Sequence, residues 1–138
     1  MSLSRFLDAQ APIYATALAE LCAGQKQTHW IWFILPQLRG LGSSRNATYY
    51  GIEDAAEAAA YLAHPVLGAR LRECVEAILA HQDKSAHAIL GSPDDLKFRS
   101  CLTLFREVAA PDDTLWQRAL DQFYAGEADD ATLRLLGT

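Results

Sequence analysis

The sequence predicts an all-α fold: a single compact domain of about six to eight short helices around a central tryptophan-rich helix. Three observations predict this class. Apolar residues recur at helical spacing along most of the chain. Ser, Asp, Pro and Gly stand where the resulting helices would begin and end, and no two segments alternate well enough to pair as strands. The 138 residues suit one domain, which we expect to span 1–138.

Two helices are expected in the first part of the chain. Residues 3–11 form a short helix. Pro12 then begins a second helix, which Gly24 ends. The buried stripe of this second helix consists of Ile13, Ala17, Leu18 and Leu21.

The middle of the chain is less uniform. The alanine-rich run 53–63 favours helix by propensity. Residues 30–35 and 48–52 fit either helix or short strand. The segment 65–81 is an amphipathic helix whose first turn suits Pro65. Its apolar stripe consists of Leu67, Leu71, Cys74, Val75 and Ile78.

Three further helices are expected near the C-terminus. Ser92 is the predicted N-cap of the first, with Pro93 as its first residue and Asp94 and Asp95 beside the positive end of the helix dipole. This helix ends before Pro111. Its predicted apolar stripe is Phe98, Cys101, Leu102, Phe105 and Val108.

The second of these helices starts near Asp113 or Thr114 and ends near Gly126. It buries Trp116, Ala119, Leu120 and Phe123. The last helix starts at Asp129 and directs Leu133 and Leu136 into the core.

Charge and hydropathy exclude two classes of function. Lys and Arg number 12 and Asp and Glu 17, so the net charge of −5 argues against a general nucleic-acid binder. The longest bulky apolar run, residues 30–36, is far shorter than the roughly 20 residues of a membrane span. Residues 1–11 lack the pattern of a signal peptide. We therefore expect a cytoplasmic protein.

The cysteines and histidines form no recognisable metal or disulfide pattern. The three cysteines include no CxxC pair. Cys74 and Cys101 lie in apolar periodic stretches, which predicts reduced thiols in the core. His64, His81 and His87 do not follow the spacing of metal ligands, so no metal site is predicted.

The segment 28–37 holds two of the three tryptophans. As a helix it would be apolar nearly all round, which favours a role as the central packing element. The competing interpretation is the wall of a small-molecule pocket, with Trp30 and Gln37 as ligand contacts. His29 is then a candidate general acid or base, and otherwise a core histidine bonded to the backbone.

A segment with two glycines, residues 39–46, follows. Its backbone N–H groups could cradle an anion, with Ser44 and Arg45 as ligand contacts. It lacks the third glycine of the dinucleotide fingerprint, and the Walker pattern is absent. A flexible turn between helices is the favoured interpretation.

Acidic and basic side chains in the segment 91–97 are the third candidate. Asp95 could act as a catalytic carboxylate with His29, and Lys97 as a ligand contact. Neighbouring helical residues point about 100° apart, so Asp94 and Asp95 would not converge as a pair. The favoured interpretation makes these aspartates capping charges and Lys97 a surface or ion-pair residue.

Five blocks in order along the chain are RFLDAQAPIY, GQKQTHWIWFILPQLRGLGSS, YYGI, AAYLAHPVLGARLREC and GSPDDLKFRSCLTLF. Together they resemble the bacterial family catalogued as domain of unknown function 1810. The resemblance implies a mostly helical single domain and no known activity, substrate or cofactor. Some members carry the label calpastatin, which we take as a mislabelling because calpain inhibitors of that type are long disordered chains. The recurring polar positions of the family correspond here to Gln10, Lys26, His29, Gln37, Ser44, His64, Arg70, Asp95, Lys97 and Ser100.

Two functions stay open, and whether the protein is an enzyme is undecided. The first is binding of, or action on, a small anionic or nucleotide-like ligand, with tryptophan as stacking face and Arg45 or Lys97 as charge partner. The alternative is a non-enzymatic interaction module for a protein partner or a second copy. Its candidate contacts are Tyr49, Tyr50, Tyr61 and Trp116. The first is favoured because polar residues are embedded in the most apolar segment.

Overall fold

The computed structural model describes residues 2–137, which form ten α-helices. The helices are α1 (Ser4–Gln10), α2 (Tyr14–Ala23), α3 (Ile31–Ile34), α4 (Arg45–Tyr50), α5 (Ala55–Ala63), α6 (Leu67–Leu79), α7 (Ala86–Leu90), α8 (Asp94–Val108), α9 (Leu115–Tyr124) and α10 (Asp130–Leu136). The predicted all-α class is confirmed. The number of helices exceeds the predicted six to eight because α3, α4 and α7 are very short, with 4, 6 and 5 residues.

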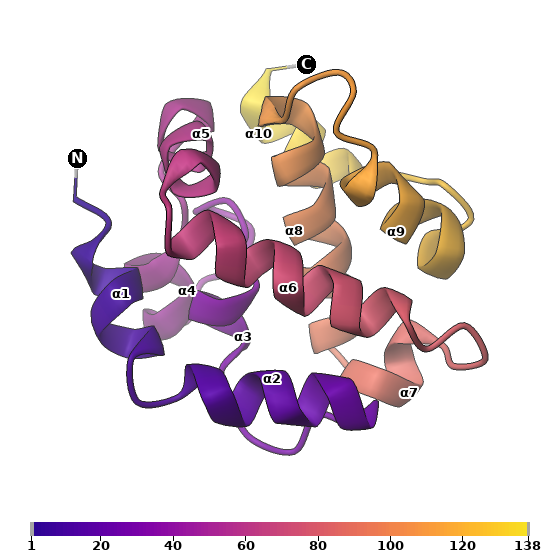
Figure 1. Cartoon of the computed structure of the whole chain (residues 1–138). Helices are drawn as coiled ribbons and strands as arrows, with labels where there is room; N and C mark the ends of the chain where they lie inside the picture. The colour runs from indigo at the N-terminus through magenta and orange to yellow at the C-terminus, as the bar shows by residue number, and fades with distance from the viewer. Residues whose placement is uncertain (1, 138) are drawn as a thin grey trace.

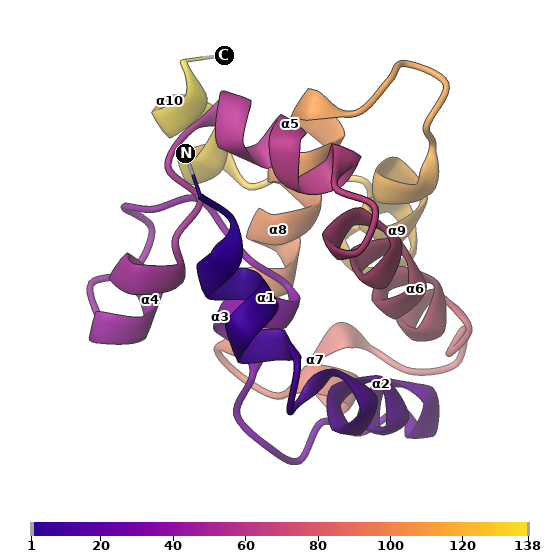
Figure 2. The same ribbon diagram turned by 60° about the vertical axis from the view of Figure 1, so that its left-hand side comes forward.

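The two longest helices, α6 and α8, organise the packing (Figure 1). Helices α5 and α9 each pack against both of them. Helix α2 covers α6, while α7 and α10 lie on α8. Helices α1, α3 and α4 pack on one another in that order and lie together at the left of Figure 2.

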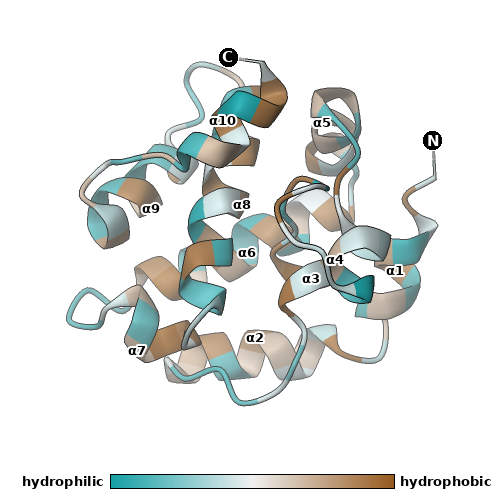
Figure 3. Ribbon diagram, turned by 180° about the vertical axis from the view of Figure 1, so that it is seen from behind, coloured by the Kyte–Doolittle hydropathy of each residue, from teal (hydrophilic) through white to brown (hydrophobic). Residues whose placement is uncertain are grey.

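The core is formed by the apolar faces of these helices. Figure 3 shows hydrophobic and hydrophilic residues alternating around the same ribbons, as amphipathic helices require. Tyr61 and Trp116, predicted as candidate partner contacts, have no exposed surface. They complete the core, where burial of a large apolar side chain stabilises the fold by about 1.5–3 kcal/mol. Tyr49 is exposed by 57% and Tyr50 is half-buried.

The expected central tryptophan-rich helix is a single turn, α3. Its end has a local cause: Leu35 precedes Pro36, and proline disfavours the helical region for the residue before it. Leu35 accordingly has φ −125° and ψ 71°. The chain beyond Pro36 is extended, and Leu38 forms an isolated parallel bridge with Ile52. The segment is buried as predicted, but its side chains do not follow helical faces.

The return of the chain toward this bridge depends on Gly51. A Cβ atom there would lie 2.7 Å from the Cα atom of Arg39, so only glycine fits without a shift. The Gly51 carbonyl accepts hydrogen bonds from the guanidinium groups of Arg5 (2.9 Å) and Arg39 (3.1 Å). These contacts hold the segment that carries Gln37 against the end of α4.

The start of α10 is predicted to within one residue, whereas the N-cap of α8 is not predicted correctly. Helix α10 begins at Asp130, one residue after the predicted start, and the Asp129 carboxylate caps it by accepting from the Thr132 amide. The prediction of Ser92 as N-cap of α8 is wrong, because α8 begins at Asp94 with Pro93 in the N-cap position. No side chain bonds the first turn of α8 as a cap. Its acidic residues do lie beside the positive dipole end, as expected.

Cys74 and Cys101 are buried free thiols, as predicted, whereas Cys22 is exposed. Burial raises the pKa of Cys74 to about 12 and raises the pKa of Cys101 as well. Both thiols are therefore protonated and unreactive near neutral pH. Between residues 2 and 137, no helix combines the length and apolar character needed to cross a bilayer. The same residues contain no group of three or more His, Cys, Asp or Glu side chains placed to hold a metal ion.

Candidate functional site

The three tryptophan indoles differ in how their N–H groups are bonded. Trp30 Nε1 donates to a Glu20 carboxylate oxygen at 2.9 Å, and Trp116 Nε1 donates to Asp113 at 3.1 Å. Trp32 Nε1 is buried and has no acceptor. Leaving a buried N–H unbonded costs about 1–3 kcal/mol. One other buried side-chain atom in residues 2–137 lacks a partner, the Nε of Arg5, whose guanidinium is otherwise held by Glu57 at 2.6 Å.

Lys97, on the first turns of α8, lies directly beside this indole. Its ammonium is 5.3 Å from the centroid of the Trp32 ring, within range of a cation–π contact. Lys97 is half-buried, and no acidic side chain among residues 2–137 pairs with it. The predicted role of Lys97 as an ion-pair residue is therefore not realised within the described chain. Lys26, by contrast, pairs with Asp94 at 2.9 Å.

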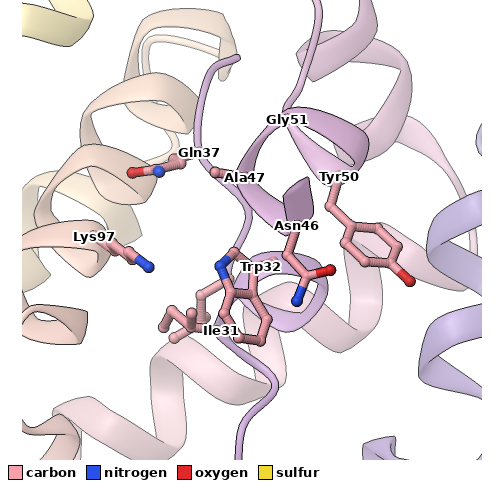
Figure 4. Close-up of a pocket in the computed structure, with 9 residues that line it drawn as sticks. Ile31, Trp32, Gln37, Asn46, Ala47, Tyr50, Gly51 and Lys97 are labelled. Atoms are coloured by element: carbon pink, nitrogen blue, oxygen red, sulfur yellow. The ribbon is translucent and has the colours of Figure 1, made fainter. Parts of the chain in front are cut away.

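These two groups line a small cavity between α3, α4 and α8, called here the Trp32 cavity. Figure 4 shows the Lys97 ammonium and the Trp32 indole nitrogen pointing toward one another, with the Gln37 amide above them and Asn46 beside the indole. The cavity has a volume of about 10 Å³, far below the roughly 300–1,000 Å³ of typical ligand pockets. Its lining residues are Ile31, Trp32, Leu35, Gln37, Asn46, Ala47, Tyr50, Gly51 and Lys97, none of them acidic.

Two larger grooves open on either side of Lys97. The α10 groove has a volume of about 320 Å³ and is lined by Gln37, Leu41, Gly42, Pro93, Leu96, Lys97, Arg99, Ser100, Asp129 and Ala131. The His29 groove has a volume of about 390 Å³ and is lined by Lys26, Gln27, His29, Ile31, Trp32, Leu90, Ser92, Pro93, Asp94 and Lys97. Lys97 borders the cavity and both grooves. A ligand anchored at Lys97 can therefore extend into a groove.

The loop that carries His29 is held in place by Glu20. The Glu20 carboxylate accepts hydrogen bonds from the Gln27 amide (2.9 Å), the Thr28 amide (3.1 Å), the Thr28 hydroxyl (2.7 Å) and the Trp30 indole (2.9 Å). Burial by itself raises the pKa of Glu20, but these four bonds outweigh it and lower the pKa to about 2. The loop is anchored at its other side by the Lys26–Asp94 ion pair.

Among the predicted ligand contacts, the structure brings Gln37 and Lys97 together at the Trp32 cavity. Trp30 lies elsewhere: it has no exposed surface and its N–H is bonded to Glu20. The Ser44 hydroxyl caps α4 by accepting from the Ala47 amide at 3.1 Å. Arg45 is exposed on α4 and lines neither the cavity nor the two grooves.

The predicted catalytic pair is not joined by any contact that the described residues show. His29 is exposed and lines its groove, so it is not a core histidine. The Asp95 carboxylate lies 3.5 Å from His87 instead. The groove receives Asp94, the neighbour of Asp95, from the same helical turn.

Sequence reasoning did not select Trp32 or Asn46. The helix predicted for residues 28–37 ends at Ile34, so helical spacing could not show which side chains of this segment lie together. Asn46 enters the cavity through α4, which the sequence left ambiguous. The sequence did contain one indication of this site, because Gln37 and Lys97 are both among the recurring polar positions of the family that the chain resembles.

Other polar positions of that family serve the fold. Buried Gln10 donates its amide hydrogens to the Phe33 carbonyl (2.7 Å) and the Tyr61 hydroxyl (3.0 Å). Its oxygen accepts from Arg70 at 3.3 Å. We call these residues the Gln10 cluster. Outside it, His64 Nδ1 accepts from the backbone amides at the start of α6.

Comparison with known proteins identifies relatives but no activity. The model of the family described as "Protein of unknown function (DUF1810)" matches residues 1–136. A solved structure, the conserved hypothetical protein Rv1873 from Mycobacterium tuberculosis, is similar with 46% identity and a TM-score of 0.95. The alignment covers 99% of this chain and 96% of that one. No curated protein matches the chain.

Neither description mentions calpastatin, so the link to that label is not borne out. The family match spans almost every residue, and the structural match extends over the same length at high identity. The expectation drawn from the five sequence blocks is thereby confirmed. The chain belongs to the DUF1810 family of proteins of unknown function.

Proposed function

We propose that the protein binds a small anionic ligand at the Trp32 cavity, with an oxygen of the anion between the Lys97 ammonium and Trp32 Nε1. The observation that carries the proposal is the buried Trp32 N–H next to the Lys97 ammonium, the first without an acceptor and the second without an acidic partner among residues 2–137. An anionic oxygen would satisfy both donors at once. Charge-assisted hydrogen bonds of this kind are the stronger ones in proteins.

The dimensions of the cavity support an anchor rather than a complete pocket. About 10 Å³ accommodates little more than one oxygen atom of a ligand, whereas the two grooves beside Lys97, of about 320 and 390 Å³, could hold the remainder of a ligand of nucleotide size. Catalysis by His29 and Asp95 is left out of the proposal, because no described contact joins these residues. We place the protein in the cytoplasm, which the two buried free thiols support.

A thermal-shift screen of inorganic phosphate, nucleotides, sugar phosphates and small carboxylic acids tests this function. A ligand at one hundred times its dissociation constant stabilises the fold by about 2.7 kcal/mol, which is several degrees for a domain of this size. The variant Lys97→Met should lose the shift. Arg118→Met, which removes one positive charge from exposed α9 surface, is the matched control and should keep it.

Two results would contradict the proposal. One is the absence of a shift across the whole set of anions. The other is a shift of equal size in wild type and Lys97→Met, because an anion held elsewhere would not depend on this ammonium.

A second candidate function is contact with a partner protein or a second copy of the chain. The observation that favours it is the exposure of large apolar side chains, Leu96 by 59% and Tyr49 by 57%. Light scattering tests self-association. A wild-type dimer that dissociates when Leu96→Asp is introduced would support this function. A wild-type protein that stays monomeric at high concentration would exclude a second copy as the partner.

A further inference from the structure

We infer that the uncharged part of the ligand carries hydroxyl groups and lies in the His29 groove, so that the ligand is a hydroxylated anion, either a sugar phosphate or a sugar acid. The inference rests on the proposed function, because the anion in the Trp32 cavity provides the anchor. Trp32 and Lys97 border both the cavity and this groove, which makes them one continuous site.

The two donors proposed for the anionic oxygen differ in kind from the polar groups farther along the groove. Lys97 and the Trp32 indole can only donate hydrogen bonds, as suits an anionic oxygen. In the groove, His29, Gln27 and Ser92 have no side-chain partner among residues 2–137. Neutral imidazole, amide and hydroxyl groups each both donate and accept. A hydroxyl group also does both, so such a set is matched by a ligand with several hydroxyls.

The groove carries little net charge apart from Lys97. The Lys26 ammonium is paired with Asp94 at 2.9 Å and also donates to the Thr28 carbonyl at 2.6 Å. It lies 4.9 Å from the centroid of the Trp30 ring, so its position is fixed from three sides. A second anionic group would meet Asp94 there. The groove therefore favours a neutral polar group over further charge.

In the alternative α10 groove, Arg99, Ser100 and Asp129 are already bonded to other parts of the chain. Arg99 donates to the backbone carbonyls of Glu127 (2.9 Å) and Ala128 (3.0 Å). Ser100 donates to Asp129, which also caps α10. A ligand there would compete with contacts that hold α10 on α8. Because its side chains are unpartnered, the His29 groove is better suited than the α10 groove to bind the hydroxylated part of the ligand.

The loop that shapes the groove is preorganised. Glu20 fixes the backbone at Gln27 and Thr28, the two residues immediately before His29. A ligand consequently does not have to order this loop, which limits the entropic cost of binding.

Isothermal titration calorimetry with four probes tests the inference: ribose 5-phosphate, gluconate, inorganic phosphate and acetate. We expect ribose 5-phosphate to bind at least about tenfold more tightly than phosphate, or gluconate more tightly than acetate by the same factor. His29→Ala should weaken the hydroxylated probe by about 3- to 10-fold and leave phosphate and acetate unchanged. The control His87→Ala removes an exposed histidine outside the groove and should change neither.

The outcomes separate this inference from the proposed function. Equal affinity for each hydroxylated probe and its simple anion, with no effect of His29→Ala, overturns the inference and leaves anion binding intact. Loss of all binding in Lys97→Met, with a selective loss in His29→Ala, supports both. Absence of binding by all four probes overturns both. A difference in affinity between ribose 5-phosphate and phosphate identifies the anionic group as phosphate. A difference between gluconate and acetate identifies it as carboxylate.

Discussion

The Gln10 cluster and the Trp32 cavity both place polar groups among aromatic side chains, but they differ in their hydrogen bonds. In the Gln10 cluster, the amide of one side chain is bonded to a carbonyl, a hydroxyl and a guanidinium from elsewhere in the chain. In the Trp32 cavity, the indole N–H and the Lys97 ammonium have no acceptor within residues 2–137. A polar residue in an apolar segment is thus ambiguous by itself. An unpaired polar atom is the feature that points to a ligand.

The largest expected effect on stability is in the Gln10 cluster. Gln10→Ala leaves the Phe33 carbonyl and the Tyr61 hydroxyl without their donor. Because each stranded buried group costs about 1–3 kcal/mol, we expect the free energy of unfolding to fall by about 2–4 kcal/mol. Urea unfolding measures this. Asn46→Ala, in the other region, is the control and should change stability by less than about 0.5 kcal/mol. Equal losses of unfolding free energy in Gln10→Ala and Asn46→Ala would contradict the difference between the two regions.

The next largest effect is a pH-dependent loss of stability when Glu20, which holds the loop that carries His29, is replaced. The pKa of Glu20 is lowered in the folded state, from the ordinary glutamate value of 4.5 to about 2. Its stabilising contribution is therefore fully present above pH 4.5 and is lost as the pH falls toward 2. We expect Glu20→Gln to reduce stability by about 1 kcal/mol at pH 7, allowing for solvent screening, and much less at pH 2. Urea midpoints at the two pH values give the comparison. A difference that stays constant with pH would show that the carboxylate charge is not responsible.

Gln37→Leu should act in the opposite direction to Gln10→Ala. Gln37 is 9% exposed, and its side-chain amide has no hydrogen-bond partner among the described residues. Replacing it with an apolar side chain of similar size removes an unpaired amide, so we expect stability to be unchanged or to rise by up to about 1 kcal/mol. Anion affinity should fall. A marked loss of stability would mean that the Gln37 amide is bonded in the folded protein.

The smallest effect separates the tryptophans. Trp32→Phe removes a buried N–H that has no acceptor among residues 2–137, so no hydrogen bond is lost and the cost of the unpaired donor is relieved. Trp30→Phe also removes a bond to Glu20 and should cost about 1–2 kcal/mol more. Thermal unfolding of the two variants, with Trp116→Phe as a second bonded control, measures the difference. Equal costs for all three would contradict the assignment of Trp32 as the unpaired indole.

The fold was predictable to the extent that local patterns determine it. The amphipathic stripe of α6 and the start of α10 depend on neighbouring residues, and both were found, the second to within one residue. The start of α8 was missed, because Ser92 has a favourable residue type but lies outside the capping position. The length of the tryptophan-rich helix was overestimated because the restriction imposed by Pro36 ends it at one turn.

The candidate site was only partly predictable for a related reason. Gln37 and Lys97 were selected as polar groups near aromatic residues, and they do meet. Choosing Trp32 over Trp30 requires knowing that Glu20 lies against Trp30, ten positions away in the sequence. Hydrogen-bond satisfaction is a tertiary property, so spacing alone could not distinguish the two indoles.

The most direct measurement is a ¹H–¹⁵N correlation spectrum of the three indole N–H groups during titration with inorganic phosphate and, in parallel, acetate. Trp30 and Trp116 serve as internal controls, since their indoles are already bonded to carboxylates. The Trp32 signal should shift progressively and saturate with at least one of the two anions, while the other two signals stay in place. A Trp32 signal that stays fixed with both anions, or three signals that move alike, would contradict anion binding at the Trp32 cavity.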